Sequence, residues 1–370
     1  MNEHQDELDI IRDQARRFLD DAAQPEYLKT LFEQPGTLDR QTWKSAIELG
    51  WPAILHAEEH GGIGLGWSGL CVLAEELGRK AISLPLLMSA SVARLVLNSG
   101  TGDVQKEIAL SLVSGEQQAC LVVQEEGDAG LALHPAVSYK DGKLDGQTAI
   151  TAFAASADYA LVPAQQDGVL HLVLVALNQS GVTRTLEATI DNSRAYAVLR
   201  FDAAVAHSLV SGDAAVAQLW EIASAAALVT AFEQLGGAQI CLEMARDYAL
   251  ERKAFGQPIG RFQSIKSKLA DMYVRIEIAR GCALDALAAL EHGDASWKAL
   301  AAAARVGAID AYEIAARENI QTHGAIGVTW EAMPHHHYRR SRALAVELGC
   351  AFVWRERLLN ESGMGIGSPA

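Results

Sequence analysis

Residues 252–272 read RKAFGQPIGRFQSIKSKLADM, and this stretch separates two helical patterns. Before it, an Ala-rich segment of helical period extends to Arg252. Gly256 suits a left-handed helix C-cap and Pro258 cannot continue a helix, so a sharp turn presents Arg252 and Phe255 on one side of a helix end. After it, apolar residues recur at steps of three and four, which predicts a helix with one packed face. These residues are Phe262, Ile265, Leu269, Met272, Ile276 and Ala279.

The chain changes its hydrophobic period twice. Short β-rich runs with turn signals begin at about Ala119, and helical spacing returns beyond Ala215. Asp141-Gly142 and Asp167-Gly168 are candidate hairpin turns in the β-rich part. The sequence therefore predicts an α+β, mainly α fold. Its three parts are an N-terminal helical domain over residues 1–118, a middle antiparallel β domain over residues 119–212, and a C-terminal four-helix bundle over residues 213–370.

Composition excludes several classes of protein. The chain has 370 residues, of which 50% are apolar and 21% are charged, so a disulfide-stapled miniprotein and a disordered chain are excluded. The formal net charge of −15 argues against a general surface for nucleic acid or anionic membranes. The N-terminus is acidic where a secretory signal is basic, and no uncharged apolar run of about 18 residues occurs. We therefore expect a cytoplasmic protein without a membrane span.

The histidines and cysteines lack the spacing of a metal site. Three adjacent histidines, His335 to His337, cannot converge on one ion from a helix or a strand. We expect them to be solvated or stacked, and we predict no metal. The cysteines are odd in number and lack CxxC spacing, which favours buried free thiols over disulfides or zinc. They are Cys71, Cys120, Cys241, Cys282 and Cys350.

Common phosphate-binding and catalytic motifs also lack support. Residues 64–69, GLGWSG, satisfy GxGxxG, but AEEHGG precedes them instead of a strand, and no acidic residue lies near Ser89, where a dinucleotide fold needs one. We interpret this segment as a glycine-rich connection between helices. The sequence contains no GxSxG, HExxH or GxxxxGK[ST] motif, so serine hydrolase, zincin and P-loop functions are not favoured.

Two turns carry side chains that suit a large cofactor. The first follows Arg252, and the second reads QTHGAIGVTWE at residues 321–331. An arginine at a helix end is a fork for phosphate oxygens, and Phe255 offers a flat stacking surface. Gln263 and Gln321 can donate and accept hydrogen bonds, and glycines let the backbone approach a bulky ligand. The pair of motifs indicates a cofactor with a pyrophosphate and a fused ring.

With both motifs in this order, the chain resembles the acyl-CoA dehydrogenase family over nearly its whole length. In the first part, Trp51, EEHGGIGLG at residues 58–66 and EELGR at residues 75–79 are similar to the family's pattern. In the β-rich part, the similar segments are Gln124-Glu125-Glu126-Gly127, LDGQTAIT at residues 144–151, and Ala157-Asp158.

The resemblance implies an FAD-dependent enzyme that performs α,β-dehydrogenation of an acyl-CoA thioester. It also implies that FAD lies at a subunit interface of an oligomer, usually a dimer of dimers, and that electron-transfer flavoprotein accepts the electrons. Among the implied FAD contacts, Arg252, Phe255 and Gln263 would reach the ADP moiety of one cofactor. The implied contacts are Arg252, Phe255, Gln263, Gln321, Gly324 and Gly327.

The catalytic base is the main departure from the family pattern. The base is a Glu or Asp sealed from water, so that its proton affinity rises. By resemblance its position falls on Leu348 in some members and on Ala226 in others, and neither residue has a carboxylate. Two candidates remain: Glu233, two helical turns after Ala226, and Glu347, one residue before Leu348. Glu233 has a structural alternative, because a buried Glu on an apolar helix must be paired or functional.

Other departures indicate a particular kind of member. Thr148 and Ile150 stand where the family has a Lys and often a Trp, and Gly324-Ala325 replaces a Gly-Gly pair. The chain resembles the shorter subunit of heteromeric bacterial acyl-CoA dehydrogenases, which degrade steroid side chains and dicarboxylates and whose longer subunit carries the base. We therefore expect a dimer of heterodimers with a longer family member. Small residues around 223–231 permit a bulky acyl group such as a steroid side chain.

Two other functions remain open. In the first, the chain is a self-sufficient homo-oligomeric dehydrogenase that uses Glu233 or Glu347. In the second, it is a scaffold of the same fold that binds no flavin.

Overall fold

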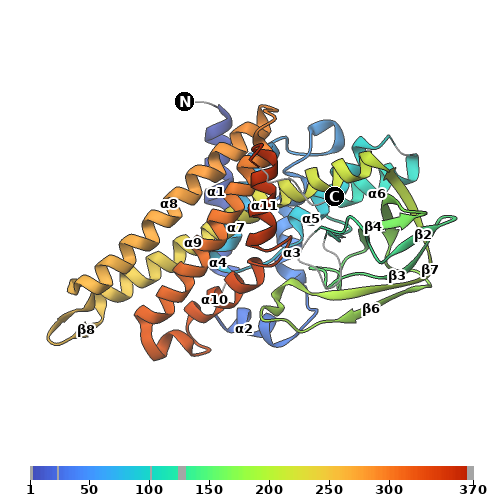
Figure 1. The fold of residues 1–370 in the computed structure, drawn as a ribbon. Helices are drawn as coiled ribbons and strands as arrows, with labels where there is room; N and C mark the ends of the chain where they lie inside the picture. The colour runs from blue at the N-terminus through green and yellow to red at the C-terminus, as the bar shows by residue number, and fades with distance from the viewer. Residues whose placement is uncertain (1–2, 23–24, 101, 124–130, 365–370) are drawn as a thin grey trace. The chain divides into compact units, whose positions relative to one another are not determined.

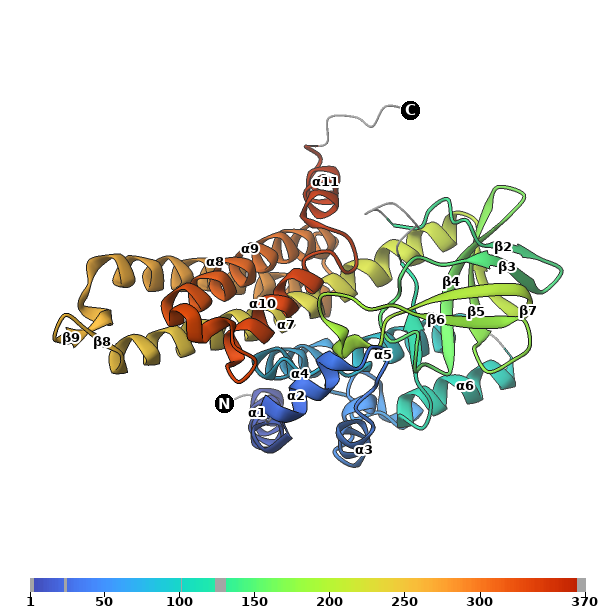
Figure 2. The same cartoon turned by 90° about the horizontal axis from the view of Figure 1, so that it is seen from below.

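A computed structural model of the chain describes residues 3–22, 25–100, 102–123 and 131–364. Helices come first, strands occupy the middle of the chain, and longer helices follow (Figure 1, Figure 2). The expected α+β, mainly α fold is therefore confirmed. The run from Gln124 to Gly127, one of the segments that carry the family resemblance, lies outside the described residues.

In the described part of the chain, six α-helices precede the first strand. Their ends follow local signals: the Asp39 carboxylate accepts a hydrogen bond from the Thr42 N–H at 2.9 Å at the start of α3, and Gly115 ends α6 with a φ of 79°. The helices are α1 (Glu3–Ala22), α2 (Pro25–Glu33), α3 (Arg40–Glu48), α4 (Gly66–Lys80), α5 (Leu86–Asn98) and α6 (Asp103–Ser114).

The strands form one mainly antiparallel sheet that closes on itself through the pairings β4–β2–β3–β7–β5–β4. β1 and β2 pair with β4 in parallel, and β6 pairs with the long β7. Asp141-Gly142 and Asp167-Gly168 lie at the β2–β3 and β4–β5 turns with positive φ, so both expected hairpins are confirmed. The strands are β1 (Ala119–Leu121), β2 (Ser138–Lys140), β3 (Lys143–Gln147), β4 (Tyr159–Gln166), β5 (Val169–Ala176), β6 (Val182–Leu186) and β7 (Ala197–Ser211).

Long helices dominate the C-terminal part, where α8 and α9 run side by side in both views (Figure 1, Figure 2). The face predicted for α8 is confirmed over its second half, where Met272, Ile276 and Ala279 are buried, whereas its first half is half-buried, at Phe262, Ile265 and Leu269. The elements are α7 (Asp213–Glu251), β8 (Lys253–Ala254), β9 (Gln257–Pro258), α8 (Gln263–Glu291), α9 (Trp297–His323), α10 (Met333–Leu344) and α11 (Ala351–Glu361).

Contacts divide the chain into two compact units that do not coincide with the three sequence segments. The first unit contains Met1–Thr30, Cys71–Ile82 and Ala227–Ala370, and the second contains Leu31–Leu70 and Ser83–Ala226. The domain boundaries after residues 118 and 212 therefore stay a prediction.

α7 is the most apolar long helix of the described residues. By length and composition it is the one helix there that could cross a membrane, but 72% of its most apolar window is buried inside the protein. A buried core helix passes the same test of composition, and burial accounts for the apolar residues of α7.

All five cysteines are free thiols. Cys71, Cys120 and Cys241 are buried, whereas Cys282 and Cys350 are half-buried. Burial raises the pKa of the Cys120 thiol to about 12 and that of the Cys71 thiol well above its usual range. These buried thiols are therefore inert at neutral pH.

Candidate functional site

The turn after Arg252 is a short β-hairpin. α7 ends at Glu251, and β8 pairs with β9 in antiparallel register. Phe255 and Gly256 form the tip with φ values of 52° and 78°, and two successive positive φ values are typical of a type I′ hairpin turn. Gly256 is thus left-handed as expected, but its expected place at a helix C-cap is wrong. Gly256 instead lies at the tip of the β8–β9 hairpin, beyond the end of the helix. The Ile259 N–H donates to the Arg252 carbonyl at 2.8 Å and joins the two ends of the hairpin.

The hairpin leaves the motif side chains in solvent. Phe255 is 96% exposed and meets Phe262 only edge-on, with the ring centroids 6.3 Å apart. Arg252 and Gln263 are also exposed. α8 begins at Gln263, and no side chain caps its first N–H groups. An arginine, an amide and an uncapped helix N-terminus therefore lie close together in the chain, and this combination suits a phosphate.

The second motif forms a tight turn at the end of α9. Gly324 follows the helix with a φ of 64° and a ψ of −140°, a conformation that side chains other than glycine rarely adopt. Gly327 is buried, and a Cβ there would lie 3.0 Å from the Ile320 carbonyl oxygen. Gln321 is exposed on the last turn of α9. The two glycines shape the turn, and the exposed Gln321 lies just before it in the chain.

A stacked pair of rings brings the two motifs together. The Tyr248 ring lies 4.3 Å from the His323 ring between centroids, with 29° between the planes. The Tyr248 carbonyl accepts the Arg252 N–H at 2.9 Å, and His323 directly precedes Gly324. The ends of α7 and α9 are therefore neighbours, so the exposed side chains of both motifs belong to one region of the first unit.

Glu233 is held by a buried arginine. Arg340, on α10, is fully buried and donates to the Glu233 carboxylate at 2.9 Å. It also donates to the Ala81 carbonyl at 2.9 Å and, at 3.4 Å, to that of Ile82, just after α4. One guanidinium thus ties α10 to α7 and to the end of α4. A carboxylate engaged in this charge-assisted bond is poorly placed to take a proton from a substrate.

A second buried arginine holds the neighbouring residue. Arg305 is fully buried on α9 and donates to the Gln234 side-chain carbonyl at 2.5 Å. Its other terminal nitrogen donates to the Leu344 and Glu347 carbonyls at 2.5 and 2.6 Å. Arg305 therefore binds backbone carbonyls at the C-terminal end of α10 and just beyond it.

The two positions at which the family pattern places a base are closed. Leu348 is 2% exposed and has a φ of 61°, and its carbonyl accepts a hydrogen bond from the Trp354 indole N–H at 3.1 Å. Glu347, beside it, is 8% exposed. Ala226 is fully buried on α7. The structure thus surrounds both expected base positions with packed side chains and bonded backbone.

Glycines explain the rest of the Glu233 motif, FEQLGG. A Cβ on Gly236 would lie 1.9 Å from the Glu75 carbonyl oxygen, and a Cβ on Gly78 would lie 1.9 Å from that of Glu233. A Cβ on Gly237 would lie 2.3 Å from the Tyr312 ring. α4 and α7 therefore cross in backbone contact, which only glycine allows at these points.

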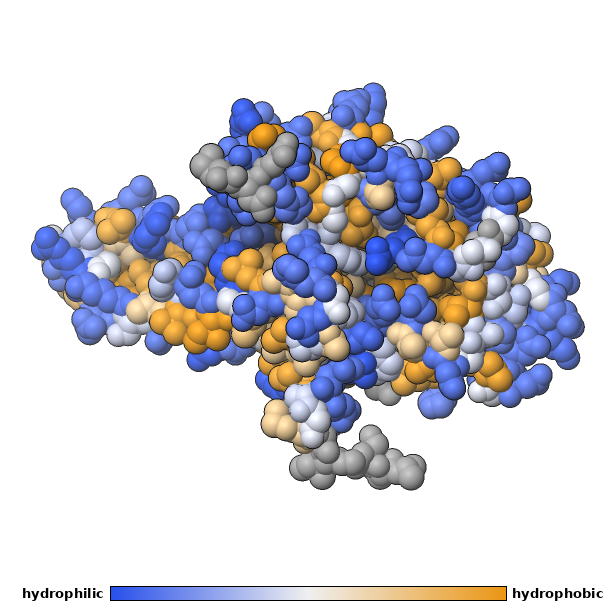
Figure 3. Space-filling view, turned by 90° about the horizontal axis from the view of Figure 1, so that it is seen from above, coloured by the Kyte–Doolittle hydropathy of each residue, from blue (hydrophilic) through white to orange (hydrophobic). Residues whose placement is uncertain are grey.

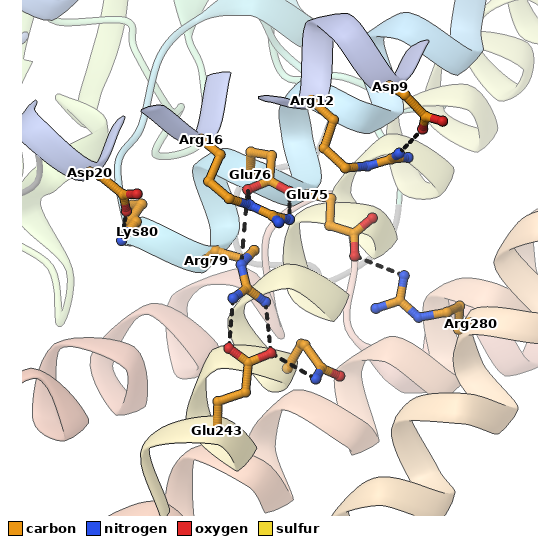
Figure 4. A network of polar contacts seen from close by, with 11 residues as sticks. Asp9, Arg12, Arg16, Asp20, Glu75, Glu76, Arg79, Lys80, Glu243 and Arg280 are labelled. Carbon is orange, nitrogen blue, oxygen red and sulfur yellow. Dashed lines mark hydrogen bonds and ion pairs between the residues drawn. The ribbon is translucent and has the colours of Figure 1, made fainter. Parts of the chain in front are cut away.

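The EELGR segment of α4 surrounds this crossing with ion pairs (Figure 4). Arg79 makes a two-pronged pair with Glu243 of α7 at 2.6 and 3.2 Å. The remaining pairs join α4 to other helices of the first unit, and they are Glu76 with Arg16 at 2.6 Å, Glu75 with Arg280 at 2.7 Å, and Lys80 with Asp20. The segment therefore has a structural role in joining α1, α4, α7 and α8.

The histidine run is packed. Trp330 meets His335 edge-on with the ring centroids 5.0 Å apart, and His337 is 1% exposed and hydrogen-bonds the Tyr312 hydroxyl at 2.9 Å. Burial, followed by the charge of Arg340, lowers the pKa of His337 to about 3. Across the residues that the structure describes, no group of three His, Cys, Asp or Glu side chains is arranged to hold a metal ion.

Sequence reasoning missed Arg305 and Arg340. Their partners lie far away in the sequence, and a charged residue in a helical pattern predicts an exposed face. The available signal was Glu233 itself, because an acidic residue on an apolar helix requires a partner.

Two segments of the chain match domains of one protein family. Residues 217–361 match "Acyl-CoA dehydrogenase, C-terminal domain", and residues 5–116 match "Acyl-CoA dehydrogenase, N-terminal domain". The chain belongs to the acyl-CoA dehydrogenase family. Acyl-CoA dehydrogenases are flavoprotein oxidoreductases that act on CH–CH bonds, and the family generally binds FAD.

Several members are similar over nearly the whole chain. The acyl-CoA dehydrogenase IpdE2 of Mycobacterium tuberculosis (strain ATCC 25618 / H37Rv) is 28% identical over 92% of this chain and 92% of its own. The short-chain specific acyl-CoA dehydrogenase of Bos taurus mitochondria is 28% identical over 84% of this chain and 80% of its own. In these relatives the similarity therefore spans both matched domains.

Solved structures of the family share the fold. A variant of the Tcur3481-Tcur3483 steroid ACAD has a TM-score of 0.89 at 27% identity, covering 99% of this chain and 100% of its own. The ChsE4-ChsE5 complex from Mycobacterium tuberculosis has a TM-score of 0.87 at 24% identity, covering 100% and 99%. At 24% identity, the similarity to the ChsE4-ChsE5 complex shows a shared fold.

Proposed function

We propose that this chain is one subunit of a heteromeric, FAD-dependent acyl-CoA dehydrogenase whose catalytic base belongs to a longer family member. The observation that carries the proposal is the bond between Arg340 and Glu233. α,β-Dehydrogenation requires a carboxylate that is free to take the α-proton of the acyl-CoA. The candidate carboxylate on α7, Glu233, is instead bound to a guanidinium, and the expected positions themselves are Ala226 and Leu348.

The exposed residues of the two motifs fit FAD. Arg252 and the uncapped start of α8 would hold the pyrophosphate, and the Phe255 ring, which is 96% exposed, would cover a flat ring system. Gln263 and Gln321 would fix polar edges of the cofactor, and Gly324 and Gly327 shape the turn beside Gln321. When bound, FAD supplies the acceptor for the hydride that leaves the β-carbon.

The exposure of this site supports an assembly. Phe255, which is 96% exposed at the hairpin tip, is available for contact with a ligand or a neighbouring chain. Two of the similar structures, the Tcur3481-Tcur3483 steroid ACAD and the ChsE4-ChsE5 complex, each carry the names of two components. Our proposal is therefore a dimer of heterodimers, with residues of both subunits around each cofactor.

The proposed substrate is a bulky acyl-CoA of the steroid side-chain type. Ala223, Ala226 and Ala227 on α7 are small residues, and small side chains leave more room for a bulky acyl group than large ones do. The likeness to a steroid ACAD supports the same class. We further propose that electron-transfer flavoprotein takes the electrons and that the enzyme works in the cytoplasm.

Isolation of the assembled enzyme tests the proposal. An affinity-tagged chain is purified from the producing cells, and its partner chain, its visible flavin absorbance and its activity with steroid side-chain acyl-CoA are measured. We expect a longer acyl-CoA dehydrogenase in equal amount, bound flavin, and activity per bound flavin that Glu233→Gln leaves largely intact. A flavin-bound homo-oligomer that loses its activity on Glu233→Gln would contradict the heteromer. A colourless preparation would support the scaffold without flavin.

A further inference from the structure

The imidazole of His323 is held in one orientation at the end of α9. His323 is the last residue of that helix and is half-buried. Its Nδ1 lies 2.9 Å from the carbonyl oxygen of Asn319, one turn earlier. Because a carbonyl oxygen can only accept a hydrogen bond, Nδ1 carries the proton in this contact. The bond ties the ring to its own helix and fixes the plane that the ring presents to its neighbours.

The plane of His323 faces the ring of Tyr248 on the last turn of α7. The two ring centroids are 4.3 Å apart and the planes are inclined by 29°, which is a stacked arrangement. Tyr248 is also half-buried, and its carbonyl accepts the N–H of Arg252, four residues later. Residues four apart share a face at the end of a helix. The stack therefore holds the root of the β8–β9 hairpin, where Arg252 begins it, against the end of α9.

A second link joins α9 to the first turns of α8. Lys268 of α8 pairs with Glu318 of α9, with 2.7 Å between the ammonium nitrogen and the carboxylate oxygen. Glu318 lies five residues before His323, and Lys268 lies five residues after Gln263. The last turns of α9 thus contact both helices that flank the first motif. The ion pair is partly open to solvent and contributes little, so the ring stack is the firmer of the two links.

The surface at this end of the long helices is mixed. In the space-filling view, the left end of the molecule, where β8 lies in Figure 1, is mainly hydrophilic with scattered hydrophobic residues (Figure 3). Hydrophobic residues do not gather into a broad face there on the side that the view shows. Specific contacts such as the stack are therefore needed to hold the turns in place.

The position of His323 in the chain connects the stack to the second motif. Gln321 lies two residues before it and Gly324 directly after it, whereas Tyr248 leads into Arg252. A ligand that contacts both motifs binds more tightly when their separation is fixed beforehand, because ordering two mobile turns opposes binding. A ring pair at the base of both turns fixes this separation.

We propose that His323 is a positioning residue, whose ring, stacked on Tyr248, holds the turns of the two motifs in the arrangement that binds FAD. The inference rests on the proposed flavin site and adds to it a residue that acts without touching the cofactor. Arg252 and Gln321 would contact the cofactor, and His323 would act through Tyr248. A phenylalanine at this position would keep a ring for the stack, whereas an alanine would not.

Amide hydrogen exchange of the purified assembly, after removal of flavin, tests the coupling without the cofactor. The N–H of Arg252 donates to Tyr248 and the N–H of Ile259 donates to Arg252, so these amides report on the end of α7 and on the hairpin. With His323→Ala we expect both to exchange about two- to tenfold faster, the factor that corresponds to the loss of an aromatic pair. His323→Phe should restore slow exchange.

His292 provides the matched control. It follows α8 directly, and its Nδ1 lies 2.6 Å from the Ala288 carbonyl oxygen, so it makes the same kind of bond to its own helix. Among the residues that the structure describes, its ring meets no other ring. His292→Ala should therefore leave exchange at Arg252 and Ile259 unchanged.

Flavin binding by the same variants tests the functional part. We expect the dissociation constant for FAD, measured by quenching of flavin fluorescence, to rise about two- to tenfold with His323→Ala. With His323→Phe it should return to within about twofold of the wild type, and His292→Ala should not change it. Tyr248→Ala should give the same rise as His323→Ala, and the double variant should add nothing further, since both act through one stack.

Three results would overturn the proposal while flavin still binds. They are unchanged exchange at Arg252 with His323→Ala, an equal effect of His292→Ala, and faster exchange without weaker flavin binding. Failure of His323→Phe to restore binding would also overturn it, because the imidazole would then contact the ligand itself. An assembly that binds no flavin would refute the proposed function together with this inference, so the two failures are distinguishable.

Discussion

Arg340 donates a hydrogen bond to the carboxylate of Glu233 at 2.9 Å, and the guanidinium is completely buried. The same arginine holds the carbonyl of Ala81, a residue with a φ of 53° at the end of α4. Three helices therefore depend on one buried charge, whose compensation comes from Glu233. This relationship makes Glu233 a counter-ion, and it leaves the chain without a free carboxylate at the expected place on α7.

Breaking the pair should destabilise the fold. Arg340→Met leaves the carboxylate of Glu233 without its guanidinium, and removing one partner of a buried pair costs about 3 kcal/mol or more. Glu233→Met with Arg340→Met should recover a large part of the loss, because both charges are gone. Chemical denaturation of the four proteins gives the coupling energy. A coupling energy near zero would mean that the pair is not structural.

The contact between α4 and α7 should not tolerate a methyl group. Gly236→Ala would place a Cβ 1.9 Å from the Glu75 carbonyl oxygen, so the helices must separate. We expect a loss of several kcal/mol, in the range of severe core overpacking. Gly281→Ala is the matched control, since its Cβ meets nothing within 4 Å and alanine favours a helix by about 1 kcal/mol. Similar melting temperatures for the two variants would refute the close crossing.

Acid should destabilise the first unit through His337. Its pKa is about 3 in the folded chain, and an unfolded histidine titrates near 6.5, so between these values the unfolded state binds more protons. Stability is therefore full above about pH 6.5 and falls as the pH drops. The loss between pH 7 and pH 5 from this residue is about 2 kcal/mol. His337→Gln should show a smaller loss in urea unfolding over this range, whereas a substitution of the exposed His207 should match the wild type.

Flavin binding should depend on Arg252. A charge-assisted bond to phosphate contributes about 1.5–3 kcal/mol, so Arg252→Ala should weaken flavin binding roughly 10- to 100-fold. Flavin absorbance per protein in the purified assembly is the measurement. Arg261→Ala, a substitution of an exposed arginine in the turn that precedes α8, is the control and should retain the flavin. If both variants retain flavin equally, the proposed site is wrong.

Local patterns in the sequence predicted much of the fold. The spacing of Met272, Ile276 and Ala279 identified the inner face of α8, and two Asp-Gly pairs identified hairpins, because these signals depend on neighbours along the chain. The hairpin at Phe255 escaped prediction, since a positive φ at phenylalanine is not a local preference. Contacts between distant segments, such as that of Arg340 with Glu233, also escaped prediction, because no local pattern encodes them.

In the candidate site too, the sequence identified residues but not the contacts between distant segments. The motifs named Arg252 and Gln321 as cofactor residues, and the Tyr248–His323 stack, which no spacing predicts, brings their helix ends together. The apolar context of Glu233 predicted a paired or functional carboxylate, and the structure supplies the partner. The sequence contained no signal that the partner would be Arg340, because a run of arginines in a helix usually faces water.

Anaerobic single turnover tests the missing base most directly. The flavin-loaded chain without its partner is mixed with a steroid side-chain acyl-CoA, and loss of the oxidised flavin absorbance is followed. We predict no bleaching by this chain alone and rapid bleaching by the complex with the longer subunit, with Glu233→Gln in the complex reacting at a similar rate. Bleaching by the chain alone that Glu233→Gln or Glu347→Gln abolishes would contradict the account.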